Sequence, residues 1–188
     1  MNKGGLAGAY AALSITLAPP SYAQTSTPEV AQNTAQATSA EYTLKAAFLY
    51  KFAPFVEWPP RAFPEPVTPL TICIAGADPF GPLADQAMLG QELGPRGATL
   101  RRIASVEAGG ACHVMFVGPN GGSPTTLRNH PILTITDGER SADEKGIIHF
   151  IIRGNRVRFE IDDRAAQQSG LSISSKLLSL AESVRPRG

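Results

Sequence analysis

The segment from residue 44 to residue 59 repeats apolar side chains at helical spacing. The residues that fall on one face are Leu44, Phe48, Phe52, Phe55 and Val56. Such a stripe predicts a helix whose apolar face packs on the core of the protein. Pro54 interrupts the pattern and should kink or split the helix, and Trp58-Pro59-Pro60 should end it, because proline cannot donate a backbone hydrogen bond.

Four short apolar segments follow this helix, and they predict strands. Residues 70–75 form a continuous apolar run, which is typical of a strand buried on both faces. The other three segments span residues 98–103, 112–117 and 132–136. One connecting helix should be capped by Asp78, with Pro79 at its first position, and run to about Leu89. A second, short helix is expected after Ser123-Pro124, and this alternation predicts right-handed crossovers and a mostly parallel sheet.

The last part of the chain predicts a different arrangement. Residues 146–152 and 156–161 are strand-like runs that flank the turn residues Gly154-Asn155, so we expect an antiparallel hairpin. Two helices should follow: one over residues 163–168, capped by Asp162 or Asp163 and stopped by Gly170, and one over residues 174–184, with Leu177, Leu178 and Ala181 facing inward. The predicted fold is an α/β layered sandwich with a mostly parallel sheet of about six strands, a late antiparallel hairpin and flanking helices.

The N-terminus has the parts of a secretory signal peptide. Lys3 precedes an Ala- and Leu-rich run over residues 6–17, and small residues follow two prolines up to Ala23. We expect cleavage after Ala23, so residues 1–23 would be removed. The alternative is a membrane anchor, but a bilayer span needs about 20 consecutive apolar residues. Residues 24–40 are small and polar and predict a disordered tether, which leaves residues 41–188 as one domain.

Composition narrows the classes of function. The chain has 43% hydrophobic and 18% charged residues and a formal net charge of +1, which predicts an ordinary soluble globule. Nucleic acids and lipid headgroups require a basic face that this charge balance does not provide. The densest positive positions, Arg101-Arg102 and the group Arg153, Arg156 and Arg158, are therefore interpreted as solvated strand edges and a turn.

None of the candidate catalytic motifs is complete. The loop at residues 76–81 has the spacing of a phosphate-binding loop but lacks the lysine and hydroxyl side chains that such a loop needs. Lys176 has Ile173 three residues before it, where a serine nucleophile would have to stand. His113, His130 and His149 are dispersed and form no zinc-binding spacing. The sequence thus predicts no enzyme, no metal site and no cofactor.

Cys73 and Cys112 are the only cysteines of the chain. Export would place them in an oxidising compartment, where an even number of cysteines favours pairing. Both lie on predicted strands that are usually neighbours in a doubly wound sheet, so a disulfide between them is possible. Two buried free thiols that act as small apolar side chains remain the alternative.

Several segments, taken in order, resemble the YfiR-like family of periplasmic proteins. They are KAAFLYKF, VEWP, ICIAGADPFG, CHVMFVG, RVRFEID and GLSISSKLLSLA, and the likeness runs from about Tyr42 to Val184. The resemblance implies a regulator that restrains an inner-membrane diguanylate cyclase by binding its periplasmic sensor domain. It also implies a homodimer, which is released from the cyclase when an outer-membrane lipoprotein captures it. Relatives carry a second cysteine pair near the late hairpin, and the matching residues 146–159 have none, so redox sensing is expected to be lost or altered.

The position of the partner interface is a further prediction. Glu160, Arg164 and Lys176 interrupt apolar segments that resemble the family, and we expect them to contact the partner. The competing hypothesis is a periplasmic small-molecule binding protein, with its ligand at the carboxyl ends of the strands near Ala75-Gly76 and Val117-Gly118. A hydrolase is the third hypothesis, and it would need a nucleophile and a base that the sequence does not show.

Overall fold

The computed structural model describes residues 1, 4, 28–90, 92–93 and 96–188, so the predicted signal peptide lies outside the described residues apart from Met1 and Gly4. One sheet holds eight strands in the order β10-β8-β7-β6-β5-β2-β4-β3. Their bounds are β2 (Leu70–Ala75), β3 (Glu92–Leu93), β4 (Arg96–Ile103), β5 (Val114–Val117), β6 (Leu133–Thr136), β7 (Ile148–Arg153), β8 (Arg156–Asp162) and β10 (Ser183–Arg185). A second, small sheet pairs β1 (Val56–Glu57) with β9 (Ser172–Ile173).

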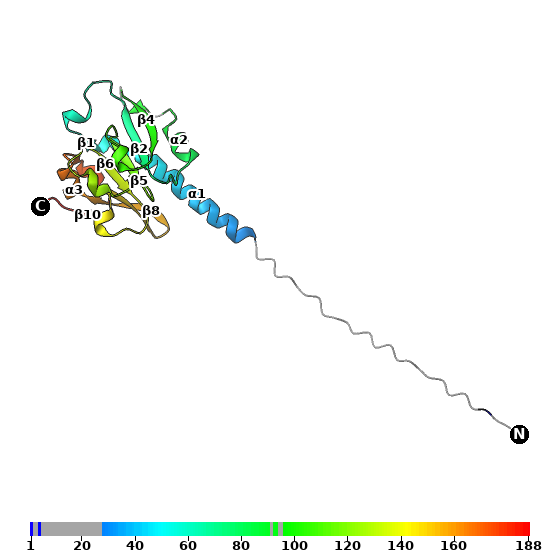
Figure 1. The fold of residues 1–188 in the computed structure, drawn as a ribbon. Coiled ribbons are helices and arrows are strands. Elements are labelled where there is room, and N and C mark those ends of the chain that lie inside the picture. The colour runs from blue at the N-terminus through cyan, green and yellow to red at the C-terminus, as the bar shows by residue number, and fades with distance from the viewer. Residues whose placement is uncertain (2–3, 5–27, 91, 94–95) are drawn as a thin grey trace.

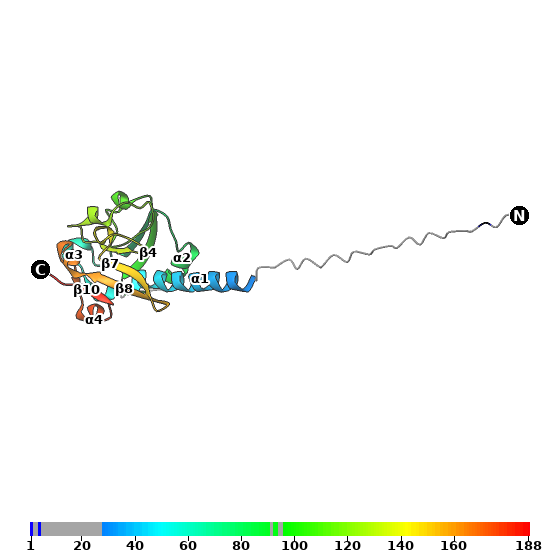
Figure 2. The same cartoon turned by 90° about the horizontal axis from the view of Figure 1, so that it is seen from below.

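Four α-helices and five single turns of 3₁₀ helix flank the described part of the sheets. The α-helices are α1 (Pro28–Lys51), α2 (Pro82–Met88), α3 (Asp163–Gln168) and α4 (Ser175–Leu178). The 3₁₀ turns are η1 (Ala53–Phe55), η2 (Pro60–Ala62), η3 (Val106–Ala108), η4 (Pro124–Leu127) and η5 (Ala142–Glu144). Helix α1 lies along one side of the domain, and its first half extends beyond the domain (Figures 1 and 2).

The topology confirms the predicted fold class. Strands β4, β2, β5, β6 and β7 are parallel to one another, and β7 and β8 form the predicted antiparallel hairpin. The sheet is larger than expected because β3 and β10 extend its two edges. The turn between β7 and β8 consists of Gly154 and Asn155, which have φ values of +56° and +57°. Positive φ at both central residues is the conformation that matches the twist of a two-residue hairpin.

The first helix packs on this hairpin through four aromatic rings. Phe52 is 2% exposed, and its ring centroid lies 5.1 Å from that of Phe159 and 6.0 Å from that of Phe150. Phe48 stacks on Phe52 with the ring centroids 5.3 Å apart and also contacts both hairpin rings. The main core therefore joins the beginning of the domain to its end, and it covers one face of the sheet.

Two predictions about helices at the ends of the domain are wrong. Residues 28–40 are part of α1, although they were expected to form a tether. This stretch is polar but contains four Ala and two Gln, which favour helix, and extending an existing helix costs far less free energy than starting one. Residues 174–184 do not form one helix, because α4 ends at Leu178 and residues 183–185 pair with β8 as a parallel strand. Backbone pairing with β8 outweighs the helical pattern there.

Other helix boundaries are close to the predictions. Helix α1 ends at Lys51 and η1 follows, so Pro54 splits the helical pattern as expected. The expected helix after Ser123 is the 3₁₀ turn η4. Helix α2 begins at Pro82 instead of Pro79, because the Asp78 carboxylate accepts hydrogen bonds from the backbone N–H groups of Phe80 and Gly81 and holds these residues in a turn.

Replacing Phe52 with alanine should lower the free energy of unfolding by about 3–5 kcal/mol, because the change leaves a cavity among the aromatic rings. Chemical denaturation followed by circular dichroism measures the effect. Val67→Ala is the control, since Val67 is 72% exposed and its truncation should change stability by less than about 0.5 kcal/mol. A loss below about 1 kcal/mol for Phe52→Ala would show that the aromatic cluster does not hold the two ends of the domain together.

Candidate functional site

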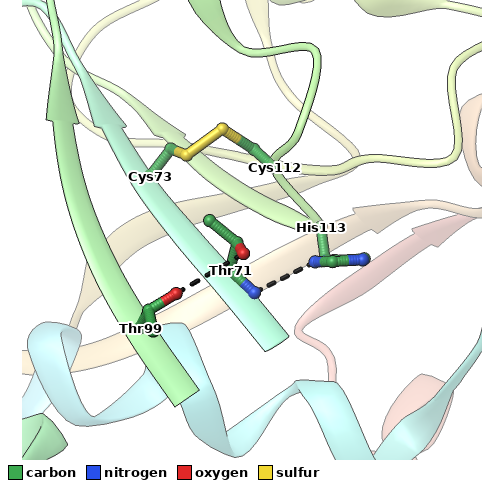
Figure 3. The surroundings of a disulfide bond; sticks show 5 residues. All are labelled: Thr71, Cys73, Thr99, Cys112 and His113. Carbon is green, nitrogen blue, oxygen red and sulfur yellow. Dashed lines mark hydrogen bonds between the residues drawn. A yellow bond between two sulfur atoms is a disulfide. The ribbon is translucent and has the colours of Figure 1, made fainter. Parts of the chain in front are cut away.

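The structure contains the expected disulfide between Cys73 and Cys112. Cys73 lies in the centre of β2, Cys112 lies just before β5, and their Cα atoms are 5.9 Å apart (Figure 3). Both residues are buried, on the sheet face opposite α1, in a second apolar cluster with Met115 and Val117. The bond thus links two neighbouring parallel strands and stabilises the smaller of the two cores.

His113 follows the disulfide and acts as a hydrogen-bonded structural residue. Its Nδ1 accepts a hydrogen bond from the backbone N–H of Thr71 at 3.0 Å, so its Nε2 carries the proton and donates to the carbonyl of Ala62 at 2.8 Å. The ring also stacks on Phe63 at 4.2 Å between centroids. Burial lowers the pKa of His113, which favours this neutral form.

The crevice at the carboxyl ends of β2 and β5 is filled by backbone. The N–H of Gly118 donates to the carbonyl of Ala75 at 2.9 Å, and the N–H of Ala77 donates to the carbonyl of Pro119 at 2.8 Å. A Cβ atom on Gly121 would lie 2.4 Å from the carbonyl oxygen of Ala75. The loop after β5 therefore closes on the loop after β2, and backbone atoms occupy the space where a ligand was hypothesised.

A polar cluster lies on the same sheet face as the disulfide, at β6, β7 and β8. The imidazole Nδ1 of His149 hydrogen-bonds the hydroxyl of Thr136 at 3.0 Å, and that hydroxyl accepts a hydrogen bond from the N–H of Gly146. Lys145 forms a 2.7 Å ion pair with Glu160, the cross-strand neighbour of His149. Burial, followed by the charge of Lys145, lowers the pKa of His149 to about 4, so this histidine is neutral at pH 7.

The three residues expected to bind a partner have different surroundings. Glu160 is half-buried on β8, and its hydrogen bond from Lys145 lowers its pKa. Arg164 is exposed on α3. Lys176 is exposed on α4, with its ammonium group 5.6 Å from the centroid of the Phe55 ring. Only Arg164 and Lys176 of the three are exposed, and Glu160 has its main contact within the domain.

The sequence reasoning missed a buried lysine. Lys45 is 1% exposed within α1, and its ammonium group forms ion pairs with Asp137 at 2.7 Å and with Glu41. It also lies 5.0 Å from the centroid of the Tyr42 ring. Burial alone would lower the pKa of Lys45, but the hydrogen bonds to Asp137 and Glu41 outweigh it, and the pKa is raised. A charged lysine in the apolar KAAFLYKF segment was the signal available from the sequence.

These contacts assign structural roles to the groups that most resemble catalytic ones. His113 and His149 lie in separate hydrogen-bonded sites, and His130 is exposed in a loop. Across residues 28–90, 92–93 and 96–188, no three side chains of His, Cys, Asp or Glu come together in a way that could hold a metal ion. Glu160, Arg164 and Lys176, the residues predicted to contact a partner, lie on β8, α3 and α4, and the surfaces of these elements are the candidate functional site.

The family comparison agrees with the fold. Residues 42–182 match the YfiR/HmsC-like family, which is most of the chain. The chain belongs to the YfiR/HmsC-like family. The match covers the second half of α1 and the main sheet up to β10, and it confirms the resemblance seen in the sequence. YfiR/HmsC-like proteins are known as periplasmic regulators and not as catalysts. No curated protein matches the chain.

Thiol counting under denaturing conditions should find no free cysteine in protein purified from the periplasm without reductant. The double variant Cys73→Ala/Cys112→Ala should lose about 4 kcal/mol of stability, because the bond closes a loop of 39 residues. Partner binding by the variant should be unchanged at a temperature where it stays folded. Two reactive thiols in the wild-type protein would refute the pairing, and lost binding by the folded variant would refute a structural role.

Stability should fall as the pH drops from 6.5 to about 4, because His149 has a usual pKa of 6.5 when unfolded and a pKa of about 4 when folded. In this range the unfolded state takes up the proton and the native state does not, which costs at most about 1.4 kcal/mol per pH unit. Denaturation curves at several pH values should show a shallower dependence for His149→Gln than for the wild type. The control Val67→Ala removes no titratable group and should keep the wild-type slope. An unchanged slope in His149→Gln would contradict the assignment.

Proposed function

We propose that this protein binds the periplasmic sensor domain of an inner-membrane diguanylate cyclase and represses cyclic di-GMP synthesis. The observation that carries the proposal is the match to the YfiR/HmsC-like family over residues 42–182. The described side chains give the enzyme hypothesis no support, and His113, His149 and Asp137 each have a structural partner. The filled crevice beside Ala75 and Gly121 also removes the reason for placing a small ligand there.

The proposal requires export to the periplasm. The parts of a signal peptide over residues 1–23 support it, with cleavage after Ala23. Among the residues that the structure describes, no helix is both long and apolar enough to span a bilayer. The mature protein would begin at Gln24 and meet the sensor domain on the outer side of the inner membrane.

Repression needs no pocket and no reaction. A binder shifts the equilibrium of its partner only if it has a higher affinity for one state, so this protein would bind the inactive state of the cyclase preferentially. Arg164 on α3 and Lys176 on α4 are exposed and could contact the sensor domain directly. Glu160 would act by holding the side chain of Lys145 in place through their 2.7 Å ion pair.

The family resemblance supports two further parts of the proposal. The protein would act as a homodimer, and an outer-membrane lipoprotein would capture it and release the cyclase. Relief of repression would then depend on competition between two partners for one regulator, which the concentration and the affinity of each partner decide together.

Deleting the gene should raise cyclic di-GMP and surface attachment, and periplasmic expression of the mature protein should reverse both. A version without residues 1–23 that stays in the cytoplasm should not restore repression, because the sensor domain lies outside the inner membrane. Liquid chromatography with mass spectrometry measures the nucleotide. Unchanged cyclic di-GMP in the deletion strain, with the cyclase intact and the regulator expressed in the parent, would refute the proposal.

A further inference from the structure

A groove lies between α1 and the tip of the β7–β8 hairpin. It encloses about 560 Å³, which is within the usual range for binding pockets. Its lining residues are Ala37, Thr38, Ala40, Glu41 and Leu44 from α1, and Ile152, Asn155, Arg156, Val157 and Arg158 from the hairpin. We name this feature the tip groove. The two ribbon views show the hairpin tip beside α1, on the side toward which the helix projects (Figures 1 and 2).

The floor of the tip groove is apolar and open to solvent. Leu44 is 42% exposed and Ile152 is 49% exposed, and both are among the most exposed large apolar side chains of the described chain. Ile152 pairs across the hairpin with Val157, on the face that carries Phe150 and Phe159 in the core. The main core thus continues outward into the groove, where the protein itself does not cover it. Exposed apolar surface of this kind favours an interaction site.

The rim of the tip groove is positively charged. Arg153 and Arg156 are directly opposite each other in the hairpin register, and Arg158 follows on the same face of β8. These arginines alternate with Ile152 and Val157, so they leave the hairpin on the face away from α1, and Arg156 and Arg158 line the groove from the edge of β8. Like charges in this position destabilise a hairpin. Arg153 has a 3.6 Å ion pair with Glu182, whereas Arg156 and Arg158 have no acidic partner within the part of the chain that the structure describes. An acidic group from outside would relieve this repulsion.

Glu41, the acidic residue that lines the groove, does not supply the carboxylate that the arginines lack. Glu41 lines the groove, but its carboxylate is an ion-pair partner of the buried Lys45. Moving Glu41 toward the arginines would leave Asp137 as the single carboxylate on a lysine that is 1% exposed. The charge of Arg156 and Arg158 is therefore available to a binding partner.

We propose that the tip groove binds a short segment of a protein partner that combines apolar side chains with carboxylates. The apolar side chains would pack on Leu44, Ile152 and Val157. The carboxylates would pair with Arg156 and Arg158 where the segment crosses the edge of β8, which β10 covers only from Glu160 onward. Arginine at the rim of an apolar patch is typical of residues that dominate binding energy. A concave groove with two unpaired arginines suits a peptide segment better than the flat surface of an anionic bilayer.

The identity of the partner rests on the proposed function, in which it is the sensor domain of the cyclase. The test is calorimetric titration of the purified sensor domain with the mature protein at several salt concentrations. Arg156→Glu/Arg158→Glu should weaken binding at least tenfold at low salt and should remove most of its salt dependence. Leu44→Ser/Ile152→Ser should weaken binding at least fivefold and leave the salt dependence unchanged.

The matched control is Arg101→Glu/Arg128→Glu, which makes the same charge change at exposed positions away from the tip groove and should alter the affinity less than twofold. The rim variant should remain folded, because Arg156→Glu places an opposite charge across from Arg153. Circular dichroism and thermal unfolding verify this for each variant.

The outcomes separate the two proposals. If the wild-type protein does not bind the sensor domain, the proposed function fails, and the groove proposal fails with it. If the rim variant binds like the wild type, only the groove proposal is refuted. Wild-type binding to phosphatidylglycerol vesicles that the rim variant loses, without any effect on sensor-domain binding, would assign the groove to a lipid surface and would also overturn the proposal.

Discussion

The contact between the aromatic face of α1 and the β7–β8 hairpin is the interaction on which the rest of the domain depends. Phe48 and Phe52 come from the start of the domain, and Phe150 and Phe159 lie about one hundred residues later in the chain. Neither element can bury its apolar face without the other. The pairing of Val56 with Ile173 adds a second link between the same two regions. The central parallel strands thus fold between two ends that stabilise each other.

The buried Lys45 gives this contact a defined geometry. Apolar packing alone tolerates sliding or rotation of a helix, but an ion pair in a buried site is satisfied in only one arrangement. Lys45 reaches Asp137 just beyond β6, so the ion pair fixes the position of α1 along its own axis over the sheet. The axial position of α1 in turn determines where Leu44 lies relative to the hairpin tip, and these two parts form the walls of the tip groove. The ion pair and the groove are two consequences of the same helix position.

Much of the sheet could be predicted from the sequence because its signals are local. The continuous apolar run of β2 and the Gly154-Asn155 turn each specify their own conformation. The disulfide could also be predicted, since β2 and β5 are neighbours in this topology. The helix boundary at Pro82 was missed because the hydrogen bonds of Asp78 compete with helix formation. Residues 183–185 were misassigned because their strand state exists only through pairing with β8.

The candidate site was less predictable than the fold, because it depends on long-range pairing that the sequence does not show. The sequence shows that Arg153, Arg156 and Arg158 are close together, but only the register shows that the first two oppose each other. Similarly, Glu160 stood out as a charge in an apolar segment, and only the structure shows that Lys145 neutralises it. Long-range pairing decides which charges are satisfied within the domain and which remain available for binding.

The hairpin holds its shape without a covalent link between its strands. Residues 146–159 contain no cysteine, and the conformation is set by the two-residue turn, the register and the packing of Phe150 and Phe159 on α1. None of these depends on redox conditions. The disulfide at Cys73 lies on the opposite face of the sheet from α1, in a different apolar cluster. Reduction would therefore weaken the smaller core first, while the surface formed by α1 and the hairpin would keep its own source of stability.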